Sequence, residues 1–363
     1  MKLNFTVPFS GFAGATFINC FASVYLFLEG TDTLRYAATY CNQWEKGICN
    51  GCGHCQTKPN ALQEKYFFLF DTMCGHSSLR CRFDGERTAM DRLINDHDFY
   101  DGGSRNNIDF LFGLAGWDYR ILTDPAAFSG AITASLSANK PVLIRLRDHR
   151  VPFAVLIGQE DGAYIYPDFK GAQDYPRNPP TDSDIAEVYL VGNRIAPRYG
   201  LADGLRRIQM VMEYNAAESL WGGYMERLGK YGPQGLDSAD AAERRAHMKR
   251  VAETMWHTFN SHNFAEVFRA FAAQIAEPYA RVGDMAKLQA PAFAEAIKRI
   301  SYPLYGYTHD LAWALIELEA CADWDKGSSS YFGEMVELTL RQIRDNDAGV
   351  LDCVREMLRL LAA

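Results

Sequence analysis

The stretch Asn19-Cys-Phe-Ala-Ser-Val-Tyr-Leu-Phe-Leu28 carries most of the information on the fold of this chain. Its apolar run predicts a mostly buried helix, which the side chain of Asn19 caps and Cys20 opens. A helix N-terminus presents unpaired N–H groups and a positive dipole end, so a cysteine there is favoured in its reactive thiolate form. Cys20 is therefore a candidate nucleophile, and a buried core thiol is the alternative.

Two residues far downstream give the chain order of a cysteine acyl-transfer site. His149 comes first, as a candidate base, and Asp168 follows a predicted hairpin, as a residue that would orient the imidazole. A two-residue turn at 161–162 sets Asp168 opposite Val155, whereas a turn centred on 160–161 sets it opposite Pro152. Both positions lie beyond His149 along the strand, unless a bulge at Pro152 brings His149 back. A solvated loop histidine is the alternative reading of His149.

Composition and charge exclude several classes of protein. A chain of 363 residues predicts about two domains, and 48% hydrophobic with 13% aromatic residues suffices to build real cores. The net charge of −8, without a long basic block, argues against nucleic acid and anionic membranes as partners. We expect a soluble protein whose partner is a small-molecule, peptide or acyl-carrier substrate, and a homodimer is left open.

The N-terminal segment does not match a targeting sequence. Polar residues and Pro8, Gly11 and Gly14 interrupt its apolar run, so we interpret residues 1–30 as a loop that leads into a buried helix. A cytoplasmic protein is therefore expected, with nine cysteines that are reduced, metal-bound or catalytic.

The pattern of the chain changes near residue 200. Before it, short apolar runs bounded by Gly, Asp and Pro predict strands at 65–70, 141–146, 151–157, 163–166 and 186–191, with helices around 89–94 and 124–136. After it, helical periodicity predicts helices at 204–231, 239–260, 264–279, 291–300, 308–324 and 331–361. The predicted fold class is α+β with an antiparallel sheet over 1–198, followed by an all-helical domain over 199–363.

A family resemblance rests on four patterns in the first half. These are Asn19-Cys20-Phe21-Ala22, Ile108-Asp-Phe-Leu-Phe-Gly-Leu-Ala-Gly116, Phe128 to Leu136 before Lys140-Pro-Val-Leu-Ile144, and Phe153-Ala-Val-Leu-Ile-Gly158 followed by Tyr164-Ile-Tyr-Pro-Asp168. With them, residues 1 to about 195 resemble the papain-like cysteine peptidase superfamily. The similarity is to its bacterial branch, which contains bacteriocin-leader peptidases and the N-terminal domain of the butirosin-biosynthesis H acyltransferase.

The resemblance implies Cys20 as nucleophile, Asp168 as the residue that orients the histidine, and a role in secondary metabolite biosynthesis. Two departures from the family pattern concern activity. The catalytic histidine of the family occupies the position of Pro152, three residues after His149. The glutamine that completes the oxyanion hole before the nucleophile has no counterpart, since the first Gln in this chain is Gln43.

A cysteine cluster is the second chemical signal. Cys41, Cys49, Cys52 and Cys55 lie on a glycine-rich stretch, and thiolates at two-residue intervals can turn inward on one cation. A structural Zn²⁺ is the preferred metal, an iron–sulfur cluster is a weaker alternative, and metal-free thiols or disulfides are a third. His54 and His76 are substitute ligands or substitute bases.

Candidate substrate-binding residues flank these signals. Asn19 precedes the candidate nucleophile, and His76 belongs to a compact polar set, 71–80, that lines either a cleft or a structured turn. Two functions follow from the sequence. One is a cysteine-dependent acyl-transfer enzyme, a peptidase or an acyltransferase, that needs no cofactor for catalysis. The other is a non-catalytic papain-like scaffold that binds a small molecule or peptide, with the cysteine cluster holding a structural metal.

Overall fold

The protein forms two compact units. The computed structural model describes residues 1–7, 9, 16–30, 61–79, 87–95, 101–149, 151–167, 176, 178–218 and, near the C-terminus, 348–349, 351–352, 354–359 and 361–362. The first unit consists of residues 1–71 and 93–199, and the second of residues 72–92 and 200–363. Each unit is described by itself.

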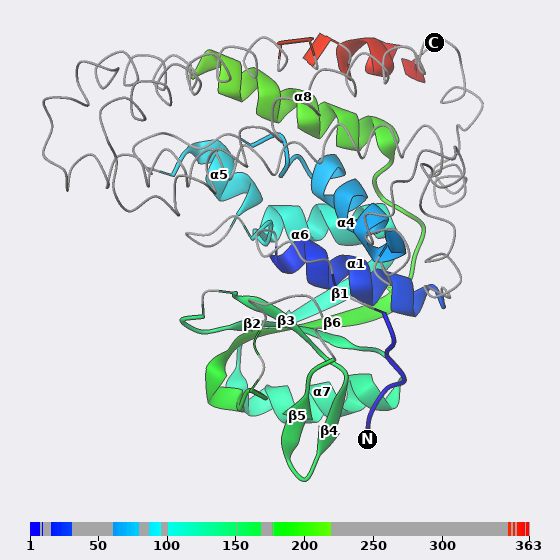
Figure 1. Cartoon of the computed structure of the whole chain (residues 1–363), viewed down its shortest axis with the longest axis vertical. Coiled ribbons are helices and arrows are strands. Elements are labelled where there is room, and N and C mark those ends of the chain that lie inside the picture. The colour runs from blue at the N-terminus through cyan, green and yellow to red at the C-terminus, as the bar shows by residue number, and fades with distance from the viewer. Residues whose placement is uncertain are drawn as a thin grey trace, which may run out of the picture. The chain divides into compact units, whose positions relative to one another are not determined.

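A four-stranded antiparallel sheet lies at the centre of the first unit (Figure 1). Its strand order is β1-β6-β2-β3, formed by β1 (Trp117–Leu122), β6 (Ile185–Arg194), β2 (Val142–Leu146) and β3 (Phe153–Leu156). A separate hairpin consists of β4 (Gly158–Glu160) and β5 (Ala163–Ile165). Mixed helix and antiparallel sheet confirms the α+β class, and the predicted strands at 141–146, 151–157, 163–166 and 186–191 are present.

Helices cover both faces of this sheet (Figure 1). On one face lie α1 (Thr16–Leu28) and α6 (Arg105–Ala115), and on the other lies α7 (Phe128–Ser137) after the short 3₁₀ helix η1 (Pro125–Ala127). The ring of Phe17 in α1 meets the ring of Phe153 in β3 edge-on, with 5.1 Å between the ring centroids. Phe112 in α6 stacks on Tyr119 in β1, with 4.3 Å between their centroids. Aromatic contacts of this kind join the two layers.

One predicted strand is a helix. Residues 65–70 lie within α4 (Ala61–Met73), so the strand prediction was wrong. A short apolar run has no period of its own and fits a buried helix as well as a strand. Tertiary packing favours the helix, because it brings two rings of this run against α1. The ring centroids are 5.0 Å apart for Phe70 and Phe21, and 5.3 Å apart for Tyr66 and Tyr25.

The remaining elements agree with the predicted ones in part. Helix α5 (Ala89–Ile94) has the predicted bounds, and α8 (Leu201–Ala217) starts three residues before the predicted helix at 204–231. Strand β1 was not predicted, although its residues alternate in burial, as expected for an edge strand. The predicted helices from 239 to 324 lie outside the described residues, whereas short helical stretches between 348 and 362 fall in the last predicted helix.

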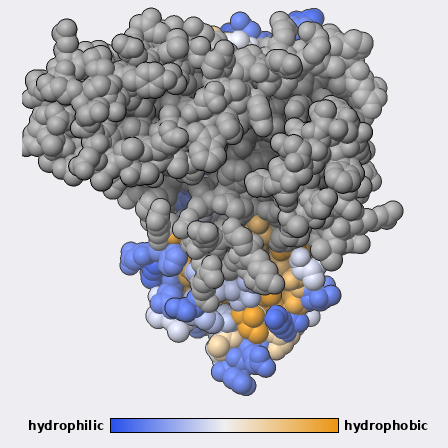
Figure 2. All heavy atoms as spheres, in the orientation of Figure 1, coloured by the Kyte–Doolittle hydropathy of each residue, from blue (hydrophilic) through white to orange (hydrophobic). Residues whose placement is uncertain are grey.

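The surface of the first unit is mixed in hydropathy. In the face drawn in Figure 2, its described residues include hydrophilic and hydrophobic ones side by side. Among the described residues, the exposed large hydrophobic side chains are Met1 in the first unit and Met210 in the second. None of the helices described here is long and apolar enough to cross a membrane.

Gly103 packs closely against both α1 and the sheet, so a substitution there tests this packing. A Cβ atom there would lie 2.4 Å from Cε2 of Phe153 and 3.3 Å from Cβ of Phe17, two side chains that are fully buried. We expect Gly103→Ala to lower the free energy of unfolding by about 1–3 kcal/mol, measured by urea denaturation. The control is Gly130→Ala in α7, where a Cβ meets nothing within 4 Å, and which should gain about 0.5–1 kcal/mol. Equal stabilities of the two variants would contradict the packing described.

Candidate functional site

Helix α1 begins at Thr16, four residues before Cys20. The backbone N–H of Phe17 donates to the carbonyl of Asp101 at 3.0 Å, so another loop satisfies part of the helix start. The prediction that Asn19 caps the helix was wrong, because Asn19 lies inside the first turns and is fully buried. Cys20 therefore sits in the second turn, where the helix dipole acts less strongly than at the first residue.

One side of α1 carries a buried polar stripe, formed by Thr16, Asn19, Cys20 and Ser23. These residues follow helical spacing, and all four are buried, with at most 3% of Thr16 exposed. Neighbouring positions are apolar and pack against other rings, as Phe21 does against Phe112 at 4.9 Å. A polar stripe inside a core is unusual, since buried side chains are mostly apolar.

Gln63 of α4 partners this stripe. Its Nε2 donates to the side-chain Oδ1 of Asn19 at 2.7 Å and to the Asn19 carbonyl at 3.2 Å, and Ser23 Oγ donates to the same carbonyl at 3.3 Å. These bonds connect two helices through the residue that precedes Cys20. Asn19, predicted to bind substrate, is thus also a structural link.

Within the part of the chain that the structure describes, one polar atom of the stripe and one of Gln63 are buried without a hydrogen-bond partner. They are Thr16 Oγ1, one turn before Cys20 on the same side of α1, and Gln63 Oε1. Leaving a buried polar atom unpaired costs about 1–3 kcal/mol, and such atoms in folded proteins commonly have a water or ligand as partner. The surroundings of Cys20 therefore have hydrogen-bonding capacity for a polar group from outside the chain.

Tyr166, which follows β5, was not predicted as a site residue. Burial raises the pKa of its phenol, and the negative charges of nearby Asp184 and of Cys20 as a thiolate raise it further. The phenol thus keeps its proton at neutral pH and lies within electrostatic range of the candidate nucleophile. The signal in the sequence was its position two residues before Asp168, at the end of the predicted hairpin.

His149 lies in the loop that joins β2 to β3. Its Nδ1 is 3.0 Å from the carbonyl oxygen of Val151 and 3.1 Å from the backbone nitrogen of the same residue. In the tautomer that carries the proton on Nδ1, the ring donates to this carbonyl, and Nε2 keeps the lone pair that a base needs. The backbone of Val151 thus holds the imidazole ring of His149 in place. The role of His149 as base stays a prediction.

The hairpin after β3 turns at Asp161 and Gly162, the first of the two turns that the sequence left open. Glu160 pairs with Ala163, and both turn residues, Asp161 and Gly162, have positive φ angles of 49° and 83°, as a tight hairpin requires. The chain changes partner strand at Ile157, so β3 pairs with β2 whereas β4 pairs with β5. Asp168 lies outside the described residues, and its predicted orienting role is untested.

Other predicted site residues have separate outcomes. His76 is buried in the second unit, in a turn between Cys74 and Leu79. The predicted metal ligands Cys41, Cys49, Cys52 and Cys55 lie outside the described residues. Among the residues that the structure does describe, no group of three or more His, Cys, Asp or Glu could hold a metal ion.

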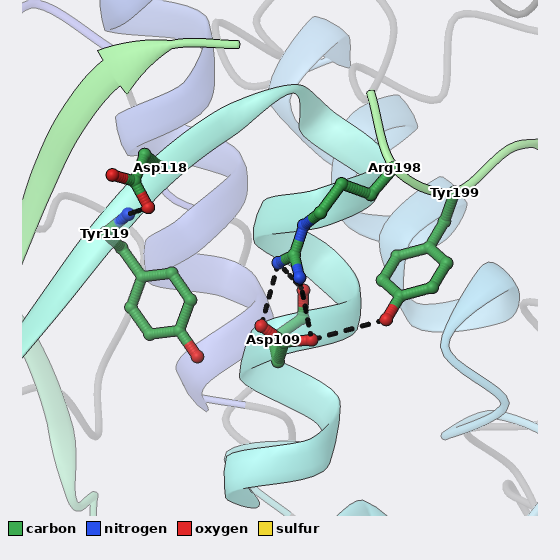
Figure 3. A network of polar contacts seen from close by, with 5 residues as sticks. All are labelled: Asp109, Asp118, Tyr119, Arg198 and Tyr199. Atoms are coloured by element: carbon green, nitrogen blue, oxygen red, sulfur yellow. Dashed lines mark hydrogen bonds and ion pairs between the residues drawn. The ribbon is translucent and has the colours of Figure 1, made fainter. Parts of the chain in front are cut away.

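A second polar network links α6 to the segment after β6 (Figure 3). Arg198 donates to the Asp109 carboxylate at 2.8 Å and to its carbonyl at 3.2 Å, and the Tyr199 hydroxyl donates to the same carboxylate at 3.3 Å. Burial raises the pKa of Tyr119, and Asp109 raises it further. Both Asp109 and Arg198 are exposed, so we interpret the network as a structural clamp on this segment.

The link between Asn19 and Gln63 offers a test of the polar stripe. We expect Asn19→Ala to lower the free energy of unfolding by about 1–3 kcal/mol, because one N–H of the buried Gln63 amide loses its acceptor. Denaturant titration measures this loss. The control is Asn193→Ala on the exposed end of β6, which should change stability by less than about 0.5 kcal/mol. A loss at Asn19 no larger than at Asn193 would argue against the buried link.

Comparisons with known proteins leave the family open. No family model, curated protein or solved structure matches this chain. The likeness to the papain-like superfamily therefore stays a prediction from the four sequence patterns.

Proposed function

We propose that the first unit is a cysteine-dependent acyl-transfer domain, a peptidase or acyltransferase, with Cys20 as its nucleophile. The observation that carries the proposal is the polar stripe on α1. Cys20 lies between Thr16 and Ser23 on this stripe, and Thr16 Oγ1 and Gln63 Oε1 are buried without partners. A thiol that only fills a core would be expected among apolar neighbours, whereas unpaired polar atoms beside a thiol suit a polar substrate group.

The reaction has two steps. The thiol gives its proton to a base, and Sγ attacks the carbonyl carbon of an ester, thioester or amide. The bond to the leaving group breaks as that group takes the proton, which leaves an acyl thioester on Cys20. Water or an acceptor amine or hydroxyl then attacks the thioester carbonyl, the C–S bond breaks, and the thiol is restored.

His149 and Tyr166 are the groups we assign to proton handling. His149 serves as the base through Nε2, in line with the contact of its Nδ1 with Val151. Tyr166 keeps its proton at neutral pH, so its hydroxyl suits hydrogen-bond donation to the oxygen that becomes negative in the first step. This hydroxyl would act in place of the oxyanion-hole glutamine, which the family pattern has and this chain lacks. Asp168 completes the proposal as the residue that orients His149.

A second candidate function is a non-catalytic scaffold with the same fold. It is favoured by the complete burial of Cys20 and by its place in the second turn of α1 rather than at the helix start. In that case the unpaired polar atoms of Thr16 and Gln63 bind a small molecule or peptide, and the Cys41–Cys55 cluster holds a structural metal. Cys20→Ser then keeps fold and binding, and metal analysis returns about one Zn²⁺ per chain.

Alkylation by iodoacetamide near neutral pH distinguishes the two functions. If Cys20 is the nucleophile, it should react about tenfold faster than a small free thiol, which is the effect of a pKa lowered by one unit on the thiolate fraction. Peptide mass spectrometry reads the modification at each cysteine. Cys74, which is also buried, is the internal control and should react slowly.

Two variants sharpen this test. His149→Ala should slow the alkylation of Cys20 and leave Cys74 unchanged, whereas Asn193→Ala should change neither. Labelling of Cys20 no faster than the free thiol would remove the enzyme proposal. Turnover of an acyl substrate that Cys20→Ser abolishes would remove the scaffold.

A further inference from the structure

Strand β1 forms one edge of the four-stranded sheet and takes no part in the steps above. Among the described residues, β6 is the strand that pairs with it. The opposite edge strand, β3, is buried along its whole length, whereas every residue of β1 is at least partly exposed. The border of the sheet at β1 is thus a place where another chain can add a strand through backbone hydrogen bonds.

The odd-numbered residues of β1 direct their backbone N–H and C=O groups away from β6. Successive residues of an antiparallel strand direct these groups to alternate sides. The carbonyl of Gly116, just before β1, accepts from the N–H of Ile195, so the even-numbered residues face β6. In agreement with this alternation, the N–H of Tyr119 donates to Oδ1 of its neighbour Asp118 at 2.8 Å rather than to β6. The irregularity in this strand pair adds a residue to β6, so β1 keeps its alternation.

Two opposite charges lie on one face of β1, two residues apart. Figure 3 shows Asp118 and Tyr119 pointing to opposite sides of the strand, and the Tyr119 ring stacks on α6. Asp118 and Arg120 therefore share the face that points away from α6, and both are exposed. The residues beside them on β6, Gly192 and Leu190, carry no charge.

Antiparallel pairing of β1 with β1 of a second copy makes these charges complementary in one register. When the two-fold axis passes through Tyr119, Asp118 of each copy lies opposite Arg120 of the other copy. The outward backbone groups of the two Tyr119 residues then bond to each other, and Trp117 lies opposite Ile121, an aromatic and β-branched pair. Moving the axis by one residue to Asp118 or to Arg120 sets like charges directly opposite each other, which is destabilising.

The hydrogen bond from the Tyr119 N–H to Asp118 closes this edge in a single copy. On pairing, the same N–H exchanges the Asp118 carboxylate for the Tyr119 carbonyl of the second copy, and Asp118 is released to meet Arg120. The donor is satisfied in both states, so pairing breaks no hydrogen bond without replacing it.

We propose that β1 is a dimerisation edge, through which two copies of this chain join their four-stranded sheets into one continuous antiparallel sheet. The six residues of β1 form a small interface, so the dimer is reversible, with a dissociation constant on the order of 10–100 μM. This dimer forms whether or not Cys20 is a nucleophile.

Sedimentation equilibrium of the full chain measures the dissociation constant of the dimer. Arg120→Asp turns both cross-strand pairs into pairs of carboxylates, so the constant should rise at least about tenfold, and Asp118→Arg should have the same effect. The two substitutions together exchange the charges and should return the constant to within about threefold of the unaltered protein. The control is Arg147→Asp, the same change of charge at an exposed residue just after β2, which should shift the constant less than about twofold.

Hydrogen exchange read by mass spectrometry locates the interface in the unaltered protein. Peptides that cover β1 should exchange more slowly as the protein concentration rises, because the outward amides of this strand become paired. Peptides that cover β2, which already has a partner strand on each side, should not change. This measurement tests the interface even where a variant fails to fold, which the thermal unfolding of each variant shows.

Three results would overturn the proposal. One is a chain that stays monomeric up to about 1 mM, which would leave the edge to a strand of another protein. Another is a dimer that both single substitutions leave intact, or that the double substitution fails to restore. The third is a dimer whose β1 peptides exchange at the same rate at every protein concentration.

Discussion

The packing of α1 between the sheet and α4 is the constraint on which the first unit depends. Its aromatic side brings Phe17 against Phe153 and Tyr189, and Phe21 against Phe70 and Phe112. Because rings in a close-packed interior have little freedom to shift, these contacts set the rotation of α1 about its axis. That rotation turns the polar stripe with Cys20 toward Gln63 of α4.

Polar groups gather at one end of the first unit. Tyr166 lies within electrostatic range of Cys20 and Asp184, and three residues after Asp184 the chain reaches Glu187 with its two arginines. Burying so many polar groups opposes folding unless each is paired or serves a ligand. The sheet supplies a rigid base for them, because β6 pairs with β1 on one side and with β2 on the other.

Sequence patterns predicted the sheet better than the helices around the site. Alternation and turn residues give strands a local signature, so the hairpin was predicted, and its pairing at Asp161-Gly162 was one of two that the sequence left open. The run at 65–70 had no such signature, and its conversion to helix depends on contacts with α1 that are remote in sequence. The start of α1 was misplaced for a related reason, since the carbonyl of Asp101 meets Phe17 N–H where a local cap was expected.

Local sequence thus determined the α+β class of the first half, the strands β2, β3, β5 and β6, the buried helix at residue 20 and the candidate nucleophile itself. Tertiary structure alone decided what surrounds that nucleophile. Gln63 and Tyr166 come from separate stretches of the chain, and the sequence did not single out either as a site residue. The physical reason is that strand pattern and helix period depend on neighbouring residues, whereas the polarity around a buried side chain depends on which distant segments pack against it.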